Sequence, residues 1–382
     1  MAISMEDGSV EKYVVIDSDS HVVETERTWQ FMDPEDEKYR PVLAPHPKDP
    51  HTQWWIINGQ ARGLRFPTLT EEEMEERSKQ LGRDVATPIG AREGDDVERR
   101  LRHMDRLGID VQVMIHTLWT VPVTDRPEVE LALCKSWNRW VAEMWRLGGG
   151  RLRWCAVPPL MSMDESVKSL EWARDHGAVG VSMPPIIGKK LLIDPYFHPL
   201  YREAERLDMA IAVHIGNGNE EIVALTQPAY DADSFGLMRF RLVTAGACEG
   251  LLESRLPLKF PKLRWAFIEA GSMWLPWMIH EAKRRMAQRK TPLPDNVLEA
   301  FNIFVTCQNN DELTYTYPLG PDNIVIGSDY GHYDGSSQMD ATLIMRQRTD
   351  IEERVKRKIL CDNAKRLWGL GSASFLLSTT VN

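Results

Sequence analysis

The chain has 382 residues, of which 43% are hydrophobic, and a formal net charge of −10 at pH 7. This length and apolar content are sufficient for a large buried core, either in several domains or in one large α/β barrel. The acidic balance argues against a nucleic-acid partner, which needs a basic face, and no apolar run approaches the roughly 20 residues that cross a bilayer.

Short apolar runs alternate with amphipathic stretches along most of the chain. The runs that predict strands are 13–16, 111–115, 152–157, 179–183, 209–213, 263–268, 303–306 and 324–326. The stretches that predict helices are 93–107, 128–146, 164–175, 199–207, 237–253, 274–288, 311–317, 337–347 and 351–367. Eight βα units in this order predict a parallel sheet that closes into a (β/α)8 barrel. The rival open sheet is disfavoured because no Gly-x-Gly-x-x-Gly follows the first strand.

Residues 25–94 separate the first βα unit from the second and are too many for an ordinary loop. We predict that they form an insertion with local structure, either a lid or a dimer contact, within one barrel domain that spans residues 1–382. A homodimer is expected because it is the commonest assembly of soluble oligomers. Residues 1–12 are polar and acidic, without the apolar core of a signal peptide, so we expect a soluble cytoplasmic protein.

The candidate chemistry lies at the C-terminal ends of the predicted strands, where the functional groups of such barrels gather. Asp19 and His21 follow the first strand two residues apart, so in extended backbone they project to the same side. His214 ends strand five, Glu269 ends strand six and Asp329 ends strand eight. Carboxylates directed into one buried volume repel each other, and a cation resolves that repulsion. Imidazole and carboxylate ligands suit zinc, iron or manganese, so we predict a divalent metal site.

The motifs around these residues resemble those of the amidohydrolase superfamily, in particular its aminocarboxymuconate-semialdehyde-decarboxylase-like branch. They are Asp-Ser-Asp-Ser-His near the start, Ala-Val-His-Ile-Gly at strand five, Phe-Pro-Lys-Leu-Arg before strand six, Gly-Ser-Asp-Tyr-Gly-His at strand eight and Asp-Asn-Ala-Lys-Arg-Leu near the end. The resemblance implies a distorted (β/α)8 barrel with one or two divalent metals. It implies further that Asp19, His21 and His214 bind metal. Asp329 then either binds metal as well or acts as the base that takes a proton from metal-bound water.

Two enzymatic functions and one inert alternative follow from this resemblance. Decarboxylases of the branch carry a histidine at the end of strand six, whereas this chain has Glu269. The difference favours a metal-dependent hydrolase that cleaves an amide, ester or lactone bond of a small ring-containing substrate. The alternative is a non-oxidative decarboxylase of an aromatic or unsaturated acid. A catalytically inert barrel would show degraded ligands at the strand ends, and here they are intact. Glu269, Asp329 and His332 are the candidate catalytic residues, His332 either binding substrate or orienting Asp329.

A second metal site is a further hypothesis. His280 lies eleven residues after Glu269, about three helical turns, on the helix that follows strand six. If that helix begins over the barrel mouth, Glu24, Glu269 and His280 hold a second ion, and such carboxylate-rich ligation suits iron or manganese. The alternatives are an ordinary helical histidine at position 280 and a hydrogen bond from His21 to Glu24.

Aromatic and polar residues also suggest how a substrate is held. The thirteen tryptophans indicate an aromatic-walled pocket, an oligomer interface or both, and Trp54, Trp55, Trp119 and Trp274 are equally candidates for the core or for an interface. Among the remaining histidines, His116 at the end of strand two is the one that we expect to enter the pocket. Arg239 and Arg241 either clamp a carboxylate or have structural roles.

Overall fold

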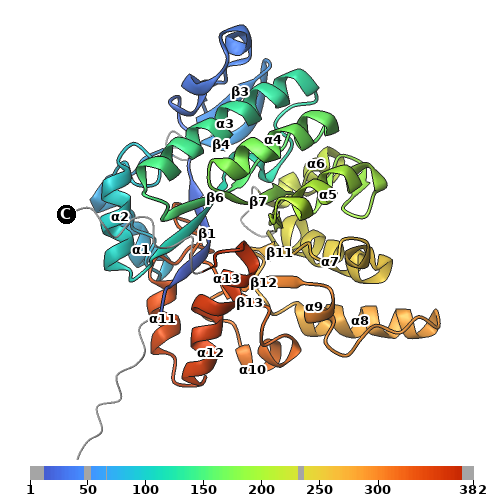
Figure 1. Ribbon diagram of the computed structural model, residues 1–382. Helices are drawn as coiled ribbons and strands as arrows, with labels where there is room; N and C mark the ends of the chain where they lie inside the picture. Colours follow the sequence, from blue (N-terminus) through green and yellow to red (C-terminus); the bar gives the residue numbers. More distant parts are fainter. Residues whose placement is uncertain (1–12, 47–52, 66, 231–235, 372–382) are drawn as a thin grey trace, which may run out of the picture.

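The computed structural model describes residues 13–46, 53–65, 67–230 and 236–371, and its centre is a sheet of eight parallel strands (Figure 1). The strands are β1 (Ile16–Val22), β5 (Val111–His116), β6 (Leu152–Ala156), β7 (Ala178–Met183), β10 (Ala210–His214), β11 (Trp265–Ile268), β12 (Ile303–Cys307) and β13 (Ile324–Ile326), and they pair in this order. A bridge between Ser20 and Tyr330 joins the first strand to the segment after the last, and the His21 N–H donates to the Tyr330 carbonyl over 2.6 Å. The sheet is therefore a nearly closed barrel, and the predicted (β/α)8 fold is confirmed.

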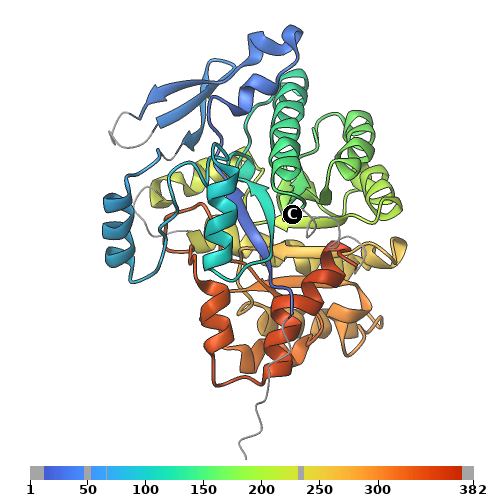
Figure 2. The same ribbon diagram turned by 60° about the vertical axis from the view of Figure 1, so that its left-hand side comes forward.

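Helices connect the strands and cover the outside of the barrel (Figures 1 and 2). They are α2 (Val97–Arg106), α3 (Pro127–Leu147), α4 (Met163–Asp175), α5 (His198–Arg206), α6 (Glu220–Tyr230), α7 (Leu242–Ser254), α8 (Leu275–Gln288), α9 (Val297–Ala300), α10 (Leu313–Thr316), α11 (Ala341–Gln347), α12 (Glu353–Arg357) and α13 (Asn363–Trp368). A π-helical turn precedes α7 and another joins α12 to α13, so the predicted helix 351–367 is three consecutive pieces. The helices α6 and α9 were not predicted.

The first strand differs from its prediction in a way that matters for the site. The apolar run 13–16 was expected to be the strand, but β1 covers Ile16–Val22 and all seven of its residues are buried. Its polar residues did not predict a strand, because Asp17, Ser18 and Ser20 hydrogen-bond to partners that are distant in sequence. Asp19 and His21 therefore lie inside β1, and the expectation that they lie beyond its end was wrong.

The barrel is filled at one end by the last helix. Trp368 of α13 is fully buried among apolar strand residues, and its indole N–H donates to Ser18 Oγ over 3.1 Å. The next residue, Gly369, lies beside Asp208 and Arg264, which precede β10 and β11. This end is therefore the N-terminal end of the strands, and the opposite end remains for a site.

The segment after β1, predicted as the insertion 25–94, contains its own helices and strands in the residues described. It contains the short helices η1 (Thr28–Phe31) and η2 (Pro34–Tyr39), an antiparallel sheet of β2 (Val42–Pro45), β3 (Gln53–Ile57) and β4 (Gln60–Arg65), and the helix α1 (Glu71–Leu81). Figure 2 shows the small sheet projecting from the barrel. The lid and dimer roles stay predictions.

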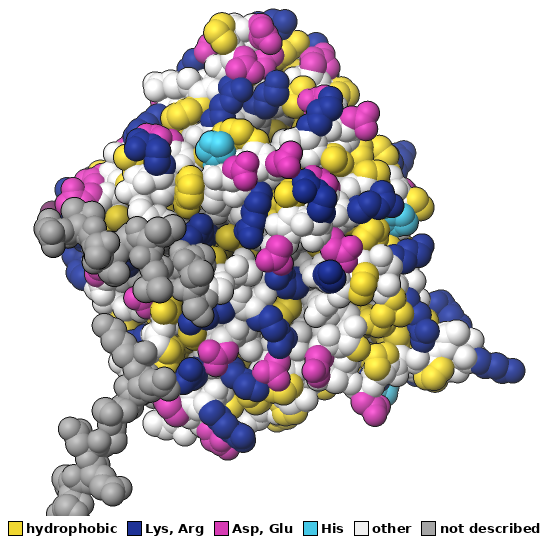
Figure 3. Space-filling model, viewed as in Figure 1, with side chains coloured by type: hydrophobic (Ala, Val, Ile, Leu, Met, Phe, Trp, Pro, Cys, Tyr) yellow, Lys and Arg dark blue, Asp and Glu magenta, His cyan; other side chains and the backbone are white. Residues whose placement is uncertain are grey.

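The surface charge and the apolar content of the helices bear on what the sequence predicts about nucleic-acid and membrane binding. The face in Figure 3 mixes basic and acidic side chains, without a continuous area of one sign on that face. Among the helices of the described residues, none combines the length and the apolar content needed to span a membrane.

Candidate metal centre

Six acidic and histidine side chains meet at the C-terminal ends of the strands. Asp19 and His21 come from β1, His214 is the last residue of β10, Glu269 follows β11, and Asp329 and His332 follow β13. One ligand atom each from Asp19, His21, His214 and Glu269 lies within 4.8 Å of the others, and His21, Glu269, Asp329 and His332 form a second such group. The structure therefore brings together most of the residues that the strand-end argument selected.

We call these six side chains the metal cluster, and within each of its two groups the ligand atoms lie close enough together for one cation to contact all four. His214 Nε2 lies 3.0 Å from Glu269 Oε2 and 3.7 Å from Asp19 Oδ1. His21 Nε2 lies 3.5 Å from both of those carboxylates and 3.3 Å from Asp329 Oδ1. The side chains are almost completely buried, Glu269 being 12% exposed.

Both histidines direct a lone pair at the cluster. His21 Nδ1 lies 2.9 Å from the His116 carbonyl, and His214 Nδ1 lies 2.9 Å from the Ile215 carbonyl. A carbonyl only accepts hydrogen bonds, so each Nδ1 carries the proton and each Nε2 is left as a ligand atom. Within the described part of the chain, both Nε2 atoms and one oxygen each of Asp19, Glu269 and Asp329 are buried without a hydrogen-bond partner. Imidazole nitrogens and carboxylate oxygens in this state fit a divalent cation.

The pKa shifts of the cluster also show that its carboxylates stabilise positive charge beside them. Burial lowers the pKa of both histidines, but Asp19 and Glu269 outweigh it, so the pKa of His214 is raised to about 9 and that of His21 well above its usual value. Burial acts against ionisation of Asp19 and Glu269, yet the two histidines hold the pKa of each carboxyl below its usual range. Burial, with the charge of Glu269, raises the pKa of Asp329 to about 6. Protons on the histidines thus take the place of a cation, and metal binding would release them.

Two of the carboxylates depend on unusual backbone. Glu269 has φ +67° and Asp329 has φ +54°, both in the left-handed region that residues other than glycine rarely adopt. The Glu269 N–H donates to Thr306 Oγ1 over 2.8 Å, and the Asp329 N–H donates to the Asp19 carbonyl over 2.9 Å. Strained backbone held in this way is common at functional sites. Here it turns the chain sharply just where a carboxylate enters the barrel mouth.

His332 forms a dyad with Asp329 at the edge of the cluster. His332 Nδ1 lies 2.7 Å from Asp329 Oδ1, and its Nε2 lies 3.1 Å from Thr117 Oγ1. The other oxygen of Asp329 accepts hydrogen bonds from the hydroxyls of Ser336 and Ser337. The histidine is therefore placed to orient Asp329, one of the two roles predicted for it.

Behind the cluster lies a buried polar network that the sequence did not reveal. Asp17 accepts hydrogen bonds from the Ser328 amide and hydroxyl, at 2.9 and 2.6 Å, and from Gln112 Nε2 at 3.1 Å. Arg100 donates to Gln112 Oε1 over 2.9 Å and to the His21 carbonyl over 2.8 Å. The network connects β1, β5, α2 and the segment after β13. Arg100 and Gln112 do not lie at the C-terminal end of a strand, so the sequence argument did not select them. Only their complete burial in the structure identifies them as part of the network behind the site.

The predicted second metal site is not formed. Glu24 accepts hydrogen bonds from the Thr117 N–H at 3.1 Å and from Trp137 Nε1 at 2.9 Å, and it belongs to neither group of ligand atoms. It is not the partner of His21 either, since His21 Nδ1 faces the His116 carbonyl. His280 is exposed on α8 and belongs to neither group of ligand atoms. Only Glu269 of the predicted second set lies in the metal cluster.

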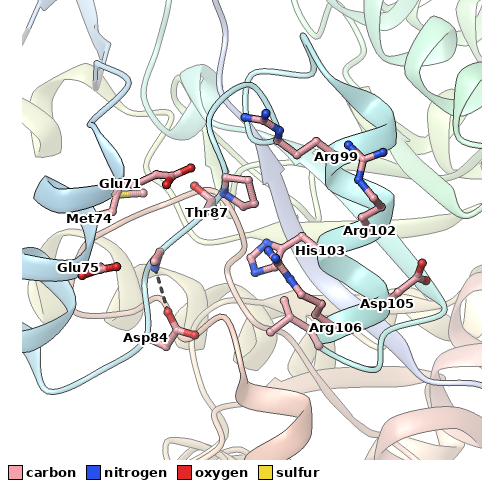
Figure 4. Close-up of a pocket in the computed structure, with 13 residues that line it drawn as sticks. Glu71, Met74, Glu75, Asp84, Thr87, Arg99, Arg102, His103, Asp105 and Arg106 are labelled. Atoms are coloured by element: carbon pink, nitrogen blue, oxygen red, sulfur yellow. Dashed lines mark hydrogen bonds between the residues drawn. The ribbon is translucent and has the colours of Figure 1, made fainter.

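A separate cleft of about 900 Å³ lies between α1 and α2 (Figure 4). Arg102 and other basic residues of α2 stand across from Glu75 and Glu71 of α1. The cleft contains no residue of the metal cluster. One residue of the cleft, His103, connects it to the segment of the cluster, because His103 Nδ1 lies 3.0 Å from the hydroxyl of Tyr330, the residue after Asp329.

Comparison with known proteins agrees with this fold. The family model described as Amidohydrolase matches residues 16–370. Among solved structures, an amidohydrolase from Mycobacterium avium subsp. paratuberculosis K-10 is 18% identical with a TM-score of 0.70, over 94% of this chain and 99% of that one. A manganese complex of 5-carboxyvanillate decarboxylase from Novosphingobium aromaticivorans is 17% identical with a TM-score of 0.65, over 97% and 99%. A 2,6-dihydroxybenzoate decarboxylase from Rhizobium is 18% identical with a TM-score of 0.64, over 94% and 99%. The resemblance noted in the sequence is thereby confirmed, and the chain belongs to the amidohydrolase superfamily of metal-dependent enzymes.

Proposed function

We propose that the protein is a metal-dependent hydrolase that cleaves a neutral, ring-containing small molecule. The observation that carries the proposal is the third carboxylate of the metal cluster, Glu269, whose Oε2 contacts the Nε2 atoms of both His21 and His214. Three carboxylates and two neutral imidazoles around one dication leave a net negative charge. A substrate carboxylate about 4 Å from that charge would be repelled by about 4 kcal/mol at an effective dielectric constant of 20. The site therefore favours a neutral substrate.

The residues around the cluster supply the proton transfers of hydrolysis. A divalent cation, when bound, lowers the pKa of a water molecule and polarises a carbonyl group. Asp329 Oδ1 is the base that takes a proton from the attacking water, since the other oxygen of Asp329 is held by Ser336 and Ser337. His332 at 2.7 Å keeps the carboxylate in position. Asp329 then gives the proton to the leaving oxygen or nitrogen, so that no separate acid is required.

The donor set also supports a choice of metal. Three oxygen and two nitrogen donors suit manganese or iron better than zinc, which takes fewer ligands and more nitrogen or sulfur. The two groups of ligand atoms share His21 and Glu269. We therefore propose one manganese or iron ion per chain.

Decarboxylation of an aromatic acid remains the alternative. It is the activity named for two of the similar structures, with which this chain shares the fold at 17% and 18% identity. Aromatic acids are anions at neutral pH, so the net negative charge of the metal cluster would repel their carboxylates.

The test is a reaction panel on chelated protein reloaded with manganese, iron or zinc. Neutral aryl esters, lactones and anilides are paired with the corresponding aromatic acids, and hydrolysis and CO₂ release are both measured. The proposal expects metal-dependent hydrolysis that is lost in Asp329→Asn and kept in His176→Asn, a change of a half-buried histidine at the end of α4, on the outside of the barrel. Metal-dependent CO₂ release without hydrolysis would replace it with the decarboxylase.

A further inference from the structure

Two polar ring atoms beside the metal cluster are buried and unused. His116 is the last residue of β5 and 2% exposed, and its Nδ1 has no hydrogen-bond partner among the residues described. Its other ring nitrogen lies 2.9 Å from Ser182 Oγ. Three residues later, in the short helix η3 (Leu118–Thr120), the indole N–H of Trp119 is buried, and the described residues offer it no partner either. Leaving such a group unpaired costs about 1–3 kcal/mol.

The His116 ring lies next to His214 of the metal cluster, and the Trp119 ring lies next to His116. The His116 ring is 5.8 Å from the His214 ring and 5.7 Å from the Trp119 ring, measured between centroids. The helix η3 packs on the loop that follows His214, because the Asn217 N–H donates to the Thr120 carbonyl over 2.7 Å. Trp119 is thereby fixed between the ends of β5 and β10, at the mouth of the barrel.

Comparison with other tryptophans shows that Trp119 differs from those whose rings only fill the core. Trp137 lies 6.1 Å from Trp119, but its indole N–H is already used by Glu24. Trp29, Trp140 and Trp265 have buried N–H groups that the described residues leave unpaired, but these side chains are fully buried. Trp145 has the same unpaired N–H on a half-buried side chain, but its ring lies against Gly177, just before β7, at the end of the barrel opposite to the site. Trp119 is only half-buried, so part of its ring is accessible to a ligand.

We propose that His116 and Trp119 form a substrate subsite for a flat ring that carries a hydrogen-bonding oxygen, such as a phenolic hydroxyl or a ring carbonyl. The ring packs against Trp119, whose N–H donates to the oxygen, and His116 Nδ1 provides a second hydrogen bond. The reactive group of the same molecule then faces His214 and the metal cluster. This inference rests on the proposed function for the reactive end and adds the chemistry of the opposite end.

The test follows the indole N–H of Trp119 by ¹H–¹⁵N NMR of zinc-loaded protein. Trp119→Phe keeps an aromatic ring, removes the N–H and so assigns its signal. Acetamide, benzamide and 3-hydroxybenzamide are titrated, with 3-hydroxybenzoate as the anionic counterpart. We expect benzamide to bind about tenfold more tightly than acetamide and the hydroxyl to add about fivefold, with a shift of the Trp119 signal.

The variants separate the subsite from general packing. Trp119→Phe and His116→Leu should abolish the gain from the hydroxyl, whereas Trp172→Phe should retain it, because Trp172 is 38% exposed on α4 and stacks on His176. The inference is overturned if the aromatic amides bind without moving the Trp119 signal, or if none of them moves it at 10 mM. Tighter binding of the benzoate, with the Trp119 signal shifted, would retain the subsite and refute the neutral substrate of the proposed function.

Discussion

Replacing Arg100 by methionine tests whether the buried network behind the metal cluster positions its ligands. The guanidinium is fully buried, donates to the His21 carbonyl and to Gln112 Oε1, and lies 4.5 Å over the ring of Tyr330. Arg100→Met keeps much of the aliphatic volume but leaves two buried acceptors unpaired, each costing about 1–3 kcal/mol. Part of this loss is offset because a buried charge is removed. We expect the free energy of unfolding of the chelated protein to fall by about 2–5 kcal/mol.

The same change should weaken metal binding, because the His21 backbone and the adjoining Tyr330 segment lose a common anchor. Partners that orient metal ligands contribute about 10–100-fold to affinity. Unfolding in urea and competition with a chromophoric chelator measure the two effects. Arg102→Met is the matched control, since Arg102 lies on the same helix, is 56% exposed and pairs with Glu98. If Arg100→Met and its control differ by less than about 0.5 kcal/mol and bind metal equally, the network has no positioning role.

Three further predictions follow from the structure. Elemental analysis should find one metal ion per chain in the wild type and in His280→Ala, and a large loss in His214→Ala; two ions, or a loss in His280→Ala, would restore the dinuclear hypothesis. Adding metal at 100 times its dissociation constant should stabilise the chelated protein by about 2.7 kcal/mol, measured by thermal unfolding, and no shift would mean that the folded chain does not bind the metal selectively. Burial raises the pKa of Glu130, which accepts a hydrogen bond from the Met161 N–H over 2.7 Å, from 4.5 to about 7. The folded state therefore prefers the neutral acid, so stability is lost as the pH rises between about 4.5 and 7. Glu130→Gln should exceed the wild type by up to about 3 kcal/mol at pH 8 and match it at pH 4.5 in urea unfolding, whereas an equal difference at both pH values would contradict the burial argument.

The strand-end rule explains why so much of the metal cluster could be predicted. In a parallel barrel the C-terminal ends of all strands meet at one mouth, so His214, Glu269 and Asp329 could be grouped although they are far apart in sequence. The alternation of side chains along a strand likewise placed Asp19 and His21 together. These are local properties of the chain combined with one topological fact.

The failures come from quantities that local patterns do not contain. His280 was placed by counting eleven residues, about three helical turns, from Glu269. The helix α8 begins only at Leu275, so this count does not give the direction of the His280 side chain. The buried residues of that helix include Met278 and Ile279, and His280 lies on the exposed side. Arg100 was missed because a buried arginine is identified only by the acceptors around it, and these come from other strands. Contacts between distant segments cannot be inferred from spacing alone.

The metal cluster is costly for the fold when no cation is bound. Two non-glycine residues in the left-handed region, Glu269 and Asp329, cost about 1–3 kcal/mol each. Three carboxylates lie against two imidazoles in a buried space, where like charges are poorly screened. A cation relieves the repulsion between the carboxylates and binds the nitrogen and oxygen atoms that have no hydrogen-bond partner. Its binding free energy therefore adds directly to the stability of the folded chain. In the chelated protein at neutral pH, Glu269 is balanced by protons on His21 and His214, so Glu269→Gln should destabilise the chelated protein and also weaken its stabilisation by metal. A variant that loses stability when chelated but keeps the full stabilisation by metal would show that Glu269 supports the fold and is not a ligand.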